Sequence, residues 1–293
     1  MWKSDLWKDY ELIDSSDGER LERWGDIILV RPDPQVIWKD RRESSLWKKY
    51  NARYIRSSKG GGAWDIKNLS RNALSEGWTI SKGDLKFKIK PTGFKHTGVF
   101  PEQAVNWEWM TEKIKEAKKT REKISVINLF AYTGGATLAC AKAGAELCHV
   151  DASKGIVSWA RENAALSGLE NAPIRYIVDD CKKFLEREIR RGRKYDALIM
   201  DPPSYGRGPG GEVWKLEDGI CELMSLASQV LSENPVFVLV NSYTTGLSAS
   251  TVGYLLSLYM KNFGGRVTAD EIGIPVTQSG MTLPAGASAR WEK

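Results

Sequence analysis

The sequence predicts an α/β fold: a mostly parallel sheet of about seven strands, with helices on both faces, preceded by a small β-rich N-terminal domain. Two observations predict it. From residue 124 onward, short apolar runs alternate with amphipathic segments of helical period, which is typical of parallel strands joined by crossover helices. Before residue 95, short runs are instead broken by Gly, Pro and Asp. We therefore expect two domains, 1–95 and 96–293.

The expected elements follow from these periods. A first helix is expected over residues 101–120, because Pro101 suits a first helical turn and Lys and Arg crowd the far end. Strands are expected near 124–130, 145–150, 173–178, 195–200 and 235–241. Helices are expected between and after them, near 135–143, 153–167, 181–191, 216–232 and 248–262. Residues 266–274 and 287–291 resemble a closing pair of strands.

The N-terminal domain is expected to be rich in strands, among them 27–32 and 85–89, the second with strict alternation of apolar residues and lysine. It holds seven of the 12 tryptophans: Trp2, Trp7, Trp24, Trp38, Trp47, Trp64 and Trp78. Tryptophans among basic residues can stack on bases, but in a small domain most are expected to fill a thin core. Residues 57–62 are expected to form a flexible loop.

Composition excludes several classes of protein. The charged (27%) and hydrophobic (42%) fractions are those of a globular domain, and no window reaches the ~18 apolar residues of a membrane span. The first residues show no signal-peptide core, so we expect a cytoplasmic protein. The four cysteines, Cys140, Cys148, Cys181 and Cys221, have no metal-ligand spacing, so we expect reduced thiols and no metal site.

Basic charge is concentrated in one segment. Residues 38–95 carry 15 Lys or Arg and 5 Asp or Glu, whereas residues 96–293 carry 23 of each. Clustered Lys and Arg are typical of surfaces that bind a phosphate backbone, although most charge runs are solvated surfaces without a partner.

The first strand of the α/β region ends in a turn with paired glycines. The turn and its approach comprise Asn128, Leu129, Phe130, Ala131, Tyr132, Thr133, Gly134 and Gly135. Glycines between a strand and a helix allow a ligand to come close to the backbone. The pattern is neither the G-x-G-x-x-G of dinucleotide enzymes nor a P-loop, and it contains no basic residue for a pyrophosphate.

Acidic residues follow the next strands. Asp151 ends the second strand, where its carboxylate can accept hydrogen bonds from both hydroxyls of a ribose. Asp179, Asp180 and Cys181 follow the third strand and offer an acceptor for an adenine amino group. Each acid alone is more often a helix N-cap or a loop residue, but their order and spacing together predict a nucleoside site.

The fourth strand ends in the turn Asp201, Pro202, Pro203, Ser204 and Tyr205. Two prolines stiffen this turn and hold its carbonyls outward beside a carboxylate and an aromatic ring. Such a rigid group of acceptors suits a planar ligand that carries N–H donors. The following glycine-rich residues, 206–211 with Arg207, suggest a substrate lid, with a plain surface loop as the alternative.

With these motifs the chain resembles class I S-adenosylmethionine-dependent methyltransferases. More narrowly, it is similar to the bacterial family that methylates cytosine C5 and guanine N7 of large-subunit ribosomal RNA. The resemblance covers roughly residues 90–293, includes the stretch 94–103, and matches the strings Asn128–Gly135 and 150–153. It implies a Rossmann-like sheet, S-adenosyl-L-methionine as cofactor and an RNA substrate. It also implies cofactor contacts at Thr97, Phe100, Gln103, Ala152 and Ser153, whereas Ala104 stands where the family often has Arg.

The residues around the fourth and fifth strands bear on which atom is methylated. Methylation of cytosine C5 needs a cysteine thiolate that adds to C6, and this chain has Ser204 after the prolines and no cysteine at residues 240–244. Cys221 is expected to be buried within its helix. A base nitrogen needs only positioning, which Asp201, the Pro202 carbonyl and a stacked Tyr205 could supply.

Three alternatives stay open at this point. A methyltransferase could act on a protein side chain or a small molecule. A nicotinamide oxidoreductase also has a glycine turn and an acid at a strand tip, but it needs no Asp-Pro-Pro turn. A non-catalytic RNA-binding module could keep a relic cofactor pocket.

Overall fold

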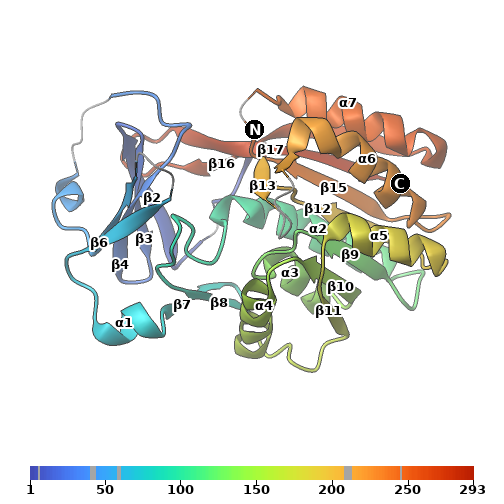
Figure 1. Ribbon diagram of the computed structural model, residues 1–293, viewed down its shortest axis with the longest axis horizontal. Coiled ribbons are helices and arrows are strands. Elements are labelled where there is room, and N and C mark those ends of the chain that lie inside the picture. The colour runs from blue at the N-terminus through green and yellow to red at the C-terminus, as the bar shows by residue number, and fades with distance from the viewer. Residues whose placement is uncertain (6, 40–43, 58–60, 208–212, 245) are drawn as a thin grey trace. The chain divides into compact units, whose positions relative to one another are not determined.

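An eight-stranded sheet forms the centre of the C-terminal part of the chain, in the order β1-β16-β17-β15-β12-β9-β10-β11 (Figure 1). Its strands are β1 (Trp2–Lys3), β9 (Ser125–Leu129), β10 (Glu146–Asp151), β11 (Ile174–Val178), β12 (Ala197–Met200), β15 (Phe237–Ser242), β16 (Arg266–Pro275) and β17 (Thr282–Glu292). The five strands from β9 to β12 and β15 are parallel, and β17 is antiparallel to β15. The predicted α/β fold with a mostly parallel sheet is confirmed.

The computed structural model describes residues 1–5, 7–39, 44–57, 61–207, 213–244 and 246–293. The chain divides into two compact units. The first comprises residues 1–2, 103–272 and 286–293, and the second comprises residues 3–102 and 273–285. The second unit therefore takes in, besides the N-terminal residues, a short C-terminal segment that comprises the end of β16, the start of β17 and the turn that joins them.

Helices follow the strands as the sequence predicts. They are α2 (Ala104–Ala117), α3 (Gly135–Lys142), α4 (Lys154–Leu166), α5 (Cys181–Arg190), α6 (Leu216–Gln229) and α7 (Ala249–Met260). A short hairpin of β13 (Tyr205–Arg207) and β14 (Val213–Lys215) precedes α6. Among the helices of the described residues, none combines the length and the apolar character needed to cross a bilayer.

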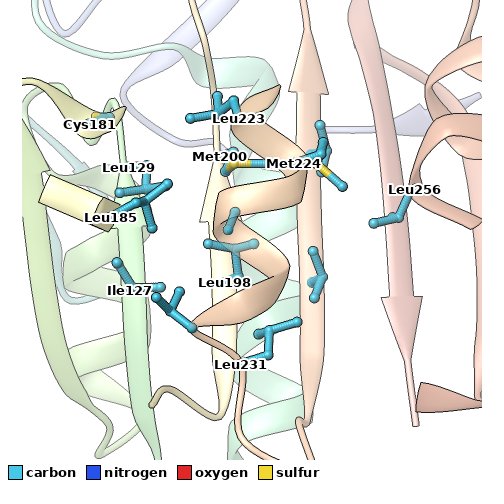
Figure 2. Packing of buried hydrophobic residues seen from close by; sticks show 14 of the residues in the cluster. Ile127, Leu129, Cys181, Leu185, Leu198, Met200, Leu223, Met224, Leu231 and Leu256 are labelled. Atoms are coloured by element: carbon cyan, nitrogen blue, oxygen red, sulfur yellow. The ribbon is translucent and has the colours of Figure 1, made fainter. Parts of the chain in front are cut away.

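The two faces of the sheet carry different side chains. Odd-numbered residues of β9, such as Ile127 and Leu129, belong to a core shared with α5, α6 and α7, where Leu185, Leu223 and Leu256 pack (Figure 2). Even-numbered Asn128 points to α3 instead, because its amide donates to Thr137 Oγ1 at 2.9 Å. This alternation follows from the period of two in a strand, and it directs the Asn128 side chain to the face that α3 covers.

The second unit contains a five-stranded sheet and a separate hairpin. The sheet comprises β2 (Tyr10–Ser16), β3 (Glu19–Trp24), β4 (Ile27–Pro32), β5 (Ala52–Arg56) and β6 (Gly62–Ile66), and the hairpin comprises β7 (Trp78–Lys82) and β8 (Leu85–Ile89). A short helix, α1 (Arg71–Ser75), lies between them in the chain. The predicted β-rich character is confirmed, and β4 and β8 have the predicted bounds. In β8, Leu85, Phe87 and Ile89 are buried while Lys86 is exposed.

Most N-terminal tryptophans have a structural role, as expected. Trp24 and Trp47 are buried, and the indole of Trp47 donates to Asp14 Oδ2 at 2.7 Å. Trp64 and Trp78 are partly buried and donate to the backbone carbonyls of residues 92 and 24. Trp38 is the most exposed of these five tryptophans, and its indole still donates to a backbone carbonyl. The loop expected at 57–62 contains residues 58–60, which lie outside the described part of the chain.

Candidate active site

The carboxyl ends of β9, β10, β11, β12 and β15 meet at one edge of the sheet. The register shows this directly: Leu129 pairs with Val150 on one side and with Met200 on the other, and Met200 pairs with Val240. The residues that follow these strands therefore lie side by side. In open α/β sheets this edge is where ligands bind. The sequence-predicted acids and the glycine turn all follow strands that end here.

The turn after β9 has an unusual backbone. Phe130 (φ 55°) and Tyr132 (φ 49°) adopt left-handed conformations, and so does Gly134 (φ 91°). Such a conformation costs a non-glycine residue about 1–2 kcal/mol, so surrounding contacts must hold it. The Phe130 N–H donates to Cys181 Sγ (3.4 Å), and the Tyr132 N–H donates to Asp151 Oδ2 (3.0 Å). The turn is thus tied to the residues after β10 and β11.

The paired glycines lie in close contact with side chains of other residues of the protein. A Cβ added to Gly135 would lie 2.4 Å from Cζ2 of Trp107, and one added to Gly134 would lie 3.3 Å from Cβ of Ala160. The close approach that the sequence predicts at these glycines is therefore made, at Gly135, by an indole on α2. Thr133 is buried, and its carbonyl accepts a hydrogen bond from Asn163 Nδ2 at 2.9 Å.

Asp151 forms the clearest acceptor at this edge. Its two carboxylate oxygens accept the N–H groups of Tyr132 (3.0 Å) and Ser153 (2.9 Å). Burial raises the pKa of this carboxyl, and the two backbone hydrogen bonds oppose that shift. A carboxylate offers about four acceptor positions, so each oxygen can take one further donor. Ala152, between Asp151 and Ser153 in the chain, is exposed. Ser153 is the N-cap of α4.

The residues after β11 have hydrogen-bond partners close by. Asp180 is the N-cap of α5, and its Oδ1 accepts the Lys183 N–H at 2.9 Å. It is exposed, so its second oxygen faces solvent. Cys181 is buried, and its sulfur accepts a hydrogen bond from the Phe130 N–H. Burial raises the pKa of this thiol.

The turn after β12 is only partly open to a ligand. The Pro203 carbonyl accepts the Trp214 indole N–H (2.7 Å), and the Ser204 carbonyl accepts the Leu216 N–H (3.1 Å). One acceptor position of each of these two carbonyls is therefore taken by a donor of the chain itself, and one position of each is left. No described residue donates to the Pro202 carbonyl. Asp201 is partly buried at the tip of the strand.

Tyr205 lies in the short β13–β14 hairpin and is 52% exposed, opposite Lys215. Of the expected lid, residues 206–211, the first two belong to β13 and residues 208–211 lie outside the described part of the chain. Cys221 is exposed on α6, so the expectation that it is buried is wrong. The buried stripe of α6 is formed by Leu216, Ile220, Leu223, Met224 and Ala227, and Cys221 falls just outside it. All four cysteines are free thiols.

The three residues taken from the 94–103 stretch divide between the two units. Gln103 belongs to the first unit, and its Nε2 donates to Tyr243 Oη at 2.8 Å. Thr97 and Phe100 belong to the second unit. Thr97 is fully buried, and its hydroxyl has no hydrogen-bond partner among the described residues. The Phe100 ring lies 5.1 Å from that of His96.

Sequence reasoning missed two residues of this edge, Trp214 and Tyr243. The Trp214 indole donates a hydrogen bond to the Pro203 carbonyl, and Tyr243 directly follows β15. The second carried a readable signal, since it is the aromatic residue at the end of the fifth strand. The described residues contain no group of three His, Cys, Asp or Glu side chains arranged to hold a metal ion.

Comparison with known proteins shows which family this chain resembles. A family model described as S-adenosylmethionine-dependent methyltransferase matches residues 54–216, more than half of the chain. The ribosomal RNA large subunit methyltransferase K/L of Shewanella frigidimarina is 31% identical over 159 residues, which are 54% of this chain and 21% of that protein. The protein of the same name from Pseudoalteromonas atlantica is 36% identical over 127 residues, 43% of this chain and 16% of that protein. The chain thus spans about a fifth of the length of these relatives.

Solved structures extend the similarity to the whole chain. The S-adenosylmethionine-dependent methyltransferase from Agrobacterium tumefaciens is 38% identical, with a TM-score of 0.91 over 99% of this chain and 92% of that one. A protein from Streptococcus mutans, assigned as a methyltransferase, is 18% identical, with a TM-score of 0.73 over 98% of this chain and 76% of that one. The second similarity shows the fold alone.

Proposed function

Because this chain belongs to the S-adenosylmethionine-dependent methyltransferase family, we propose that it methylates a base nitrogen in RNA, with ribosomal RNA as the substrate. The observation that carries the proposal is the pair of acceptor groups at one sheet edge, the Asp151 carboxylate and the Asp201–Pro202 turn. The relatives named as ribosomal RNA methyltransferases support the RNA part. The cytosine-C5 and guanine-N7 branch stays a prediction, as does a cytoplasmic location.

The residues present fit the cofactor. The Asp151 carboxylate can take both ribose hydroxyls, because its two oxygens already accept one backbone N–H each and have room for one more. The second oxygen of Asp180 can accept the adenine amino group. The backbone of 130–134 and the side chain of Gln103 complete the proposed contacts within the first unit. The contacts that the resemblance implies at Thr97 and Phe100, in the second unit, stay predictions. When bound, S-adenosylmethionine supplies a methyl group on a positively charged sulfur that leaves as a neutral thioether.

The turn after β12 suits a nitrogen acceptor. Asp201 and the Pro202 carbonyl can accept N–H bonds from an exocyclic amino group and direct its lone pair toward the methyl carbon. As the N–C bond forms, the S–C bond breaks and its electron pair stays on sulfur. The proton that the nitrogen loses can pass to the Asp201 carboxylate. Methylation of cytosine C5 would instead need a thiolate beside the base, and Cys181, whose position follows β11, is buried with its thiol pKa raised.

The basic segment supports an RNA substrate. In the β7–β8 hairpin the apolar residues face the core of the second unit, while Lys86 is exposed and Lys88 partly exposed. Lysines at alternate positions of a strand share one face, and such a row suits a phosphate backbone.

The cofactor part is tested by calorimetry with S-adenosylhomocysteine. We expect Asp151→Ala to weaken binding at least tenfold, a loss of about 1.4 kcal/mol or more, since hydrogen bonds to a charged group contribute about 1.5–3 kcal/mol each. Glu170→Gln, an exposed acid in a loop, is the matched control and should bind as the wild type does. Equal binding by Asp151→Ala and the wild type would contradict the proposed ribose contact.

The RNA part is tested by mass spectrometry of ribosomal RNA nucleosides from a deletion strain and its parent. One methylated nucleoside should be absent from the deletion strain, and purified protein should restore it. A methyl group found on carbon, or no difference between the strains, would contradict the nitrogen or the RNA assignment respectively.

A further inference from the structure

A buried polar network joins α2, β15 and β17 within the first unit. The Asn106 amide donates to Gln103 Oε1 (2.8 Å) and to Ser288 Oγ (3.0 Å). Ser288 Oγ donates to Asn241 Oδ1 (2.6 Å), and the Arg290 guanidinium donates to Asn106 Oδ1 (2.7 Å). All five residues are buried. Polar groups are costly to bury, but a network with its hydrogen bonds made holds its members in fixed positions.

This network ends at Tyr243, the first residue after β15. Gln103 Nε2 donates to Tyr243 Oη at 2.8 Å, so the side chain that Asn106 orients in turn orients the phenol. The ring also packs on the backbone of β17: a Cβ added to Gly286 would lie 2.9 Å from Cδ1 and Cε1 of Tyr243. The phenol is therefore held both at its hydroxyl and along its ring.

Tyr243 leaves the sheet beside the turn that is proposed to hold the methyl acceptor. β12 and β15 are parallel neighbours, with Met200 opposite Val240. Pro203 and Tyr243 are each the third residue beyond that pair. The Tyr243 side chain is only partly buried. An aromatic residue whose ring is held by Gln103 and Gly286 thus follows the strand next to the one that Asp201 and Pro202 follow, at the ligand-binding edge.

We propose that Tyr243 is a further substrate-side residue of the methyl-transfer site and forms one wall of its acceptor pocket. Gln103 is then the positioning residue that ties this wall to the cofactor side. The inference rests on the proposed transfer at the Asp201–Pro202 turn. A flat ring with a polar rim suits a planar heteroaromatic acceptor, such as a nucleobase, better than a lysine or a carboxylate side chain.

Five proteins test this inference: wild type, Tyr243→Ala, Tyr243→Phe, Gln103→Leu and the double variant Gln103→Leu/Tyr243→Phe. Tyr254→Phe, on an exposed part of α7, is the matched control and should behave as the wild type. Two quantities are measured: the affinity for S-adenosylhomocysteine, and the single-turnover transfer of labelled methyl from S-adenosylmethionine. The acceptors are ribosomal RNA, protein and small molecules, each isolated from a strain that lacks the gene.

We expect both Tyr243 variants to bind S-adenosylhomocysteine within about twofold of the wild type, which also shows that they fold. Tyr243→Ala should slow transfer about tenfold or more, the range of a lost base–aromatic contact. Tyr243→Phe should slow it about fivefold, the size of one lost hydrogen bond. In the Gln103→Leu background, Tyr243→Phe should have no further effect, because both changes remove the same bond.

Three results would overturn the inference: unchanged transfer by Tyr243→Ala, a cofactor affinity of Tyr243→Ala as low as that of Asp151→Ala, or independent effects of Gln103→Leu and Tyr243→Phe. Failure of the RNA proposal is seen separately. If the wild type methylates only the protein or the small-molecule fraction, the RNA substrate is wrong, and the Tyr243 variants are compared on that acceptor. Transfer to none of the fractions would overturn both.

Discussion

His149 makes the first unit sensitive to acid. Its imidazole is fully buried in β10, with Nδ1 at 2.9 Å from Thr137 Oγ1. Nε2 has no hydrogen-bond partner in the described part of the chain. Burial, helped by the nearby Arg161 cation, lowers the pKa of His149 from 6.5 to about 3. The folded protein therefore keeps this histidine neutral in a pH range where the unfolded chain binds a proton.

The sign and size of the effect follow from this difference. Between about pH 6.5 and pH 3 the unfolded state binds one more proton at His149 than the folded state does, so the free energy of unfolding falls as the pH falls. Each pH unit well inside this range costs about 1.4 kcal/mol. From pH 7 to pH 5 the free energy of unfolding falls by about 2 kcal/mol through His149. Well above pH 6.5 His149 is neutral in both states, so its full contribution to the free energy of unfolding is present there.

Urea unfolding of the wild type and His149→Gln at pH 7 and pH 5 measures this term. Glutamine cannot bind a proton, so the variant should lose about 2 kcal/mol less than the wild type over this interval, whatever its stability at pH 7. The chain has 2 histidines, so comparing the imidazole NMR signals of the two proteins identifies His149. A His149 signal that titrates near pH 6.5, or equal acid losses in the two proteins, would refute this reasoning.

Three further predictions use the same purified protein. Gly135→Ala places a methyl 2.4 Å from Trp107 and should lower the free energy of unfolding by about 1–3 kcal/mol in urea titrations; an unchanged value would mean that the indole moves away without cost. Cys221→Ser should leave methyl transfer unchanged, and a complete loss would indicate covalent chemistry at carbon. Replacing Lys86 and Lys88 with Ala should reduce the slope of log affinity for ribosomal RNA against log salt by about 2, and an equal slope would place the RNA elsewhere.

Sequence periodicity predicted the strands and helices of the first unit closely, because period and capping are local properties. The expected strand 173–178 is β11, and the expected helix 181–191 is α5, which Asp180 caps through the Lys183 N–H. The same locality explains the errors. The burial of Cys221 was predicted from the amphipathic character of α6 alone, whereas the stripe that packs is set by which residues β12 and β15 present to that helix.

Features of the edge that depend on distant residues could not be predicted. The Pro203 carbonyl accepts a hydrogen bond from the indole of Trp214, eleven residues later, and no propensity of an Asp-Pro-Pro turn indicates this. The left-handed backbone at Phe130 and Tyr132 is equally hidden, because both residues normally avoid it. It persists because Asp151 and Cys181 take up the N–H groups of that turn. These groups come from other strands, so the strain is a tertiary effect.

The two halves of the edge therefore differ in how the chain encodes them. The proposed cofactor half uses residues at the ends of β9, β10 and β11, and these lie within residues 54–216, the part that matches the family model. The acceptor side proposed here depends on contacts between residues far apart in the chain: Gln103 and Tyr243 are 140 positions apart, and Asn106 and Ser288 are 182. Tyr243 and Ser288 lie beyond the matched part. Among the residues proposed to contact the cofactor, Gln103 is hydrogen-bonded to Tyr243, whereas the Asp151 carboxylate accepts the N–H groups of Tyr132 and Ser153. A substitution at Tyr243 therefore reaches the proposed cofactor contacts through Gln103. One kind of cofactor site can thus serve different acceptors, and the residue at the tip of β15 is the first place to look for that difference.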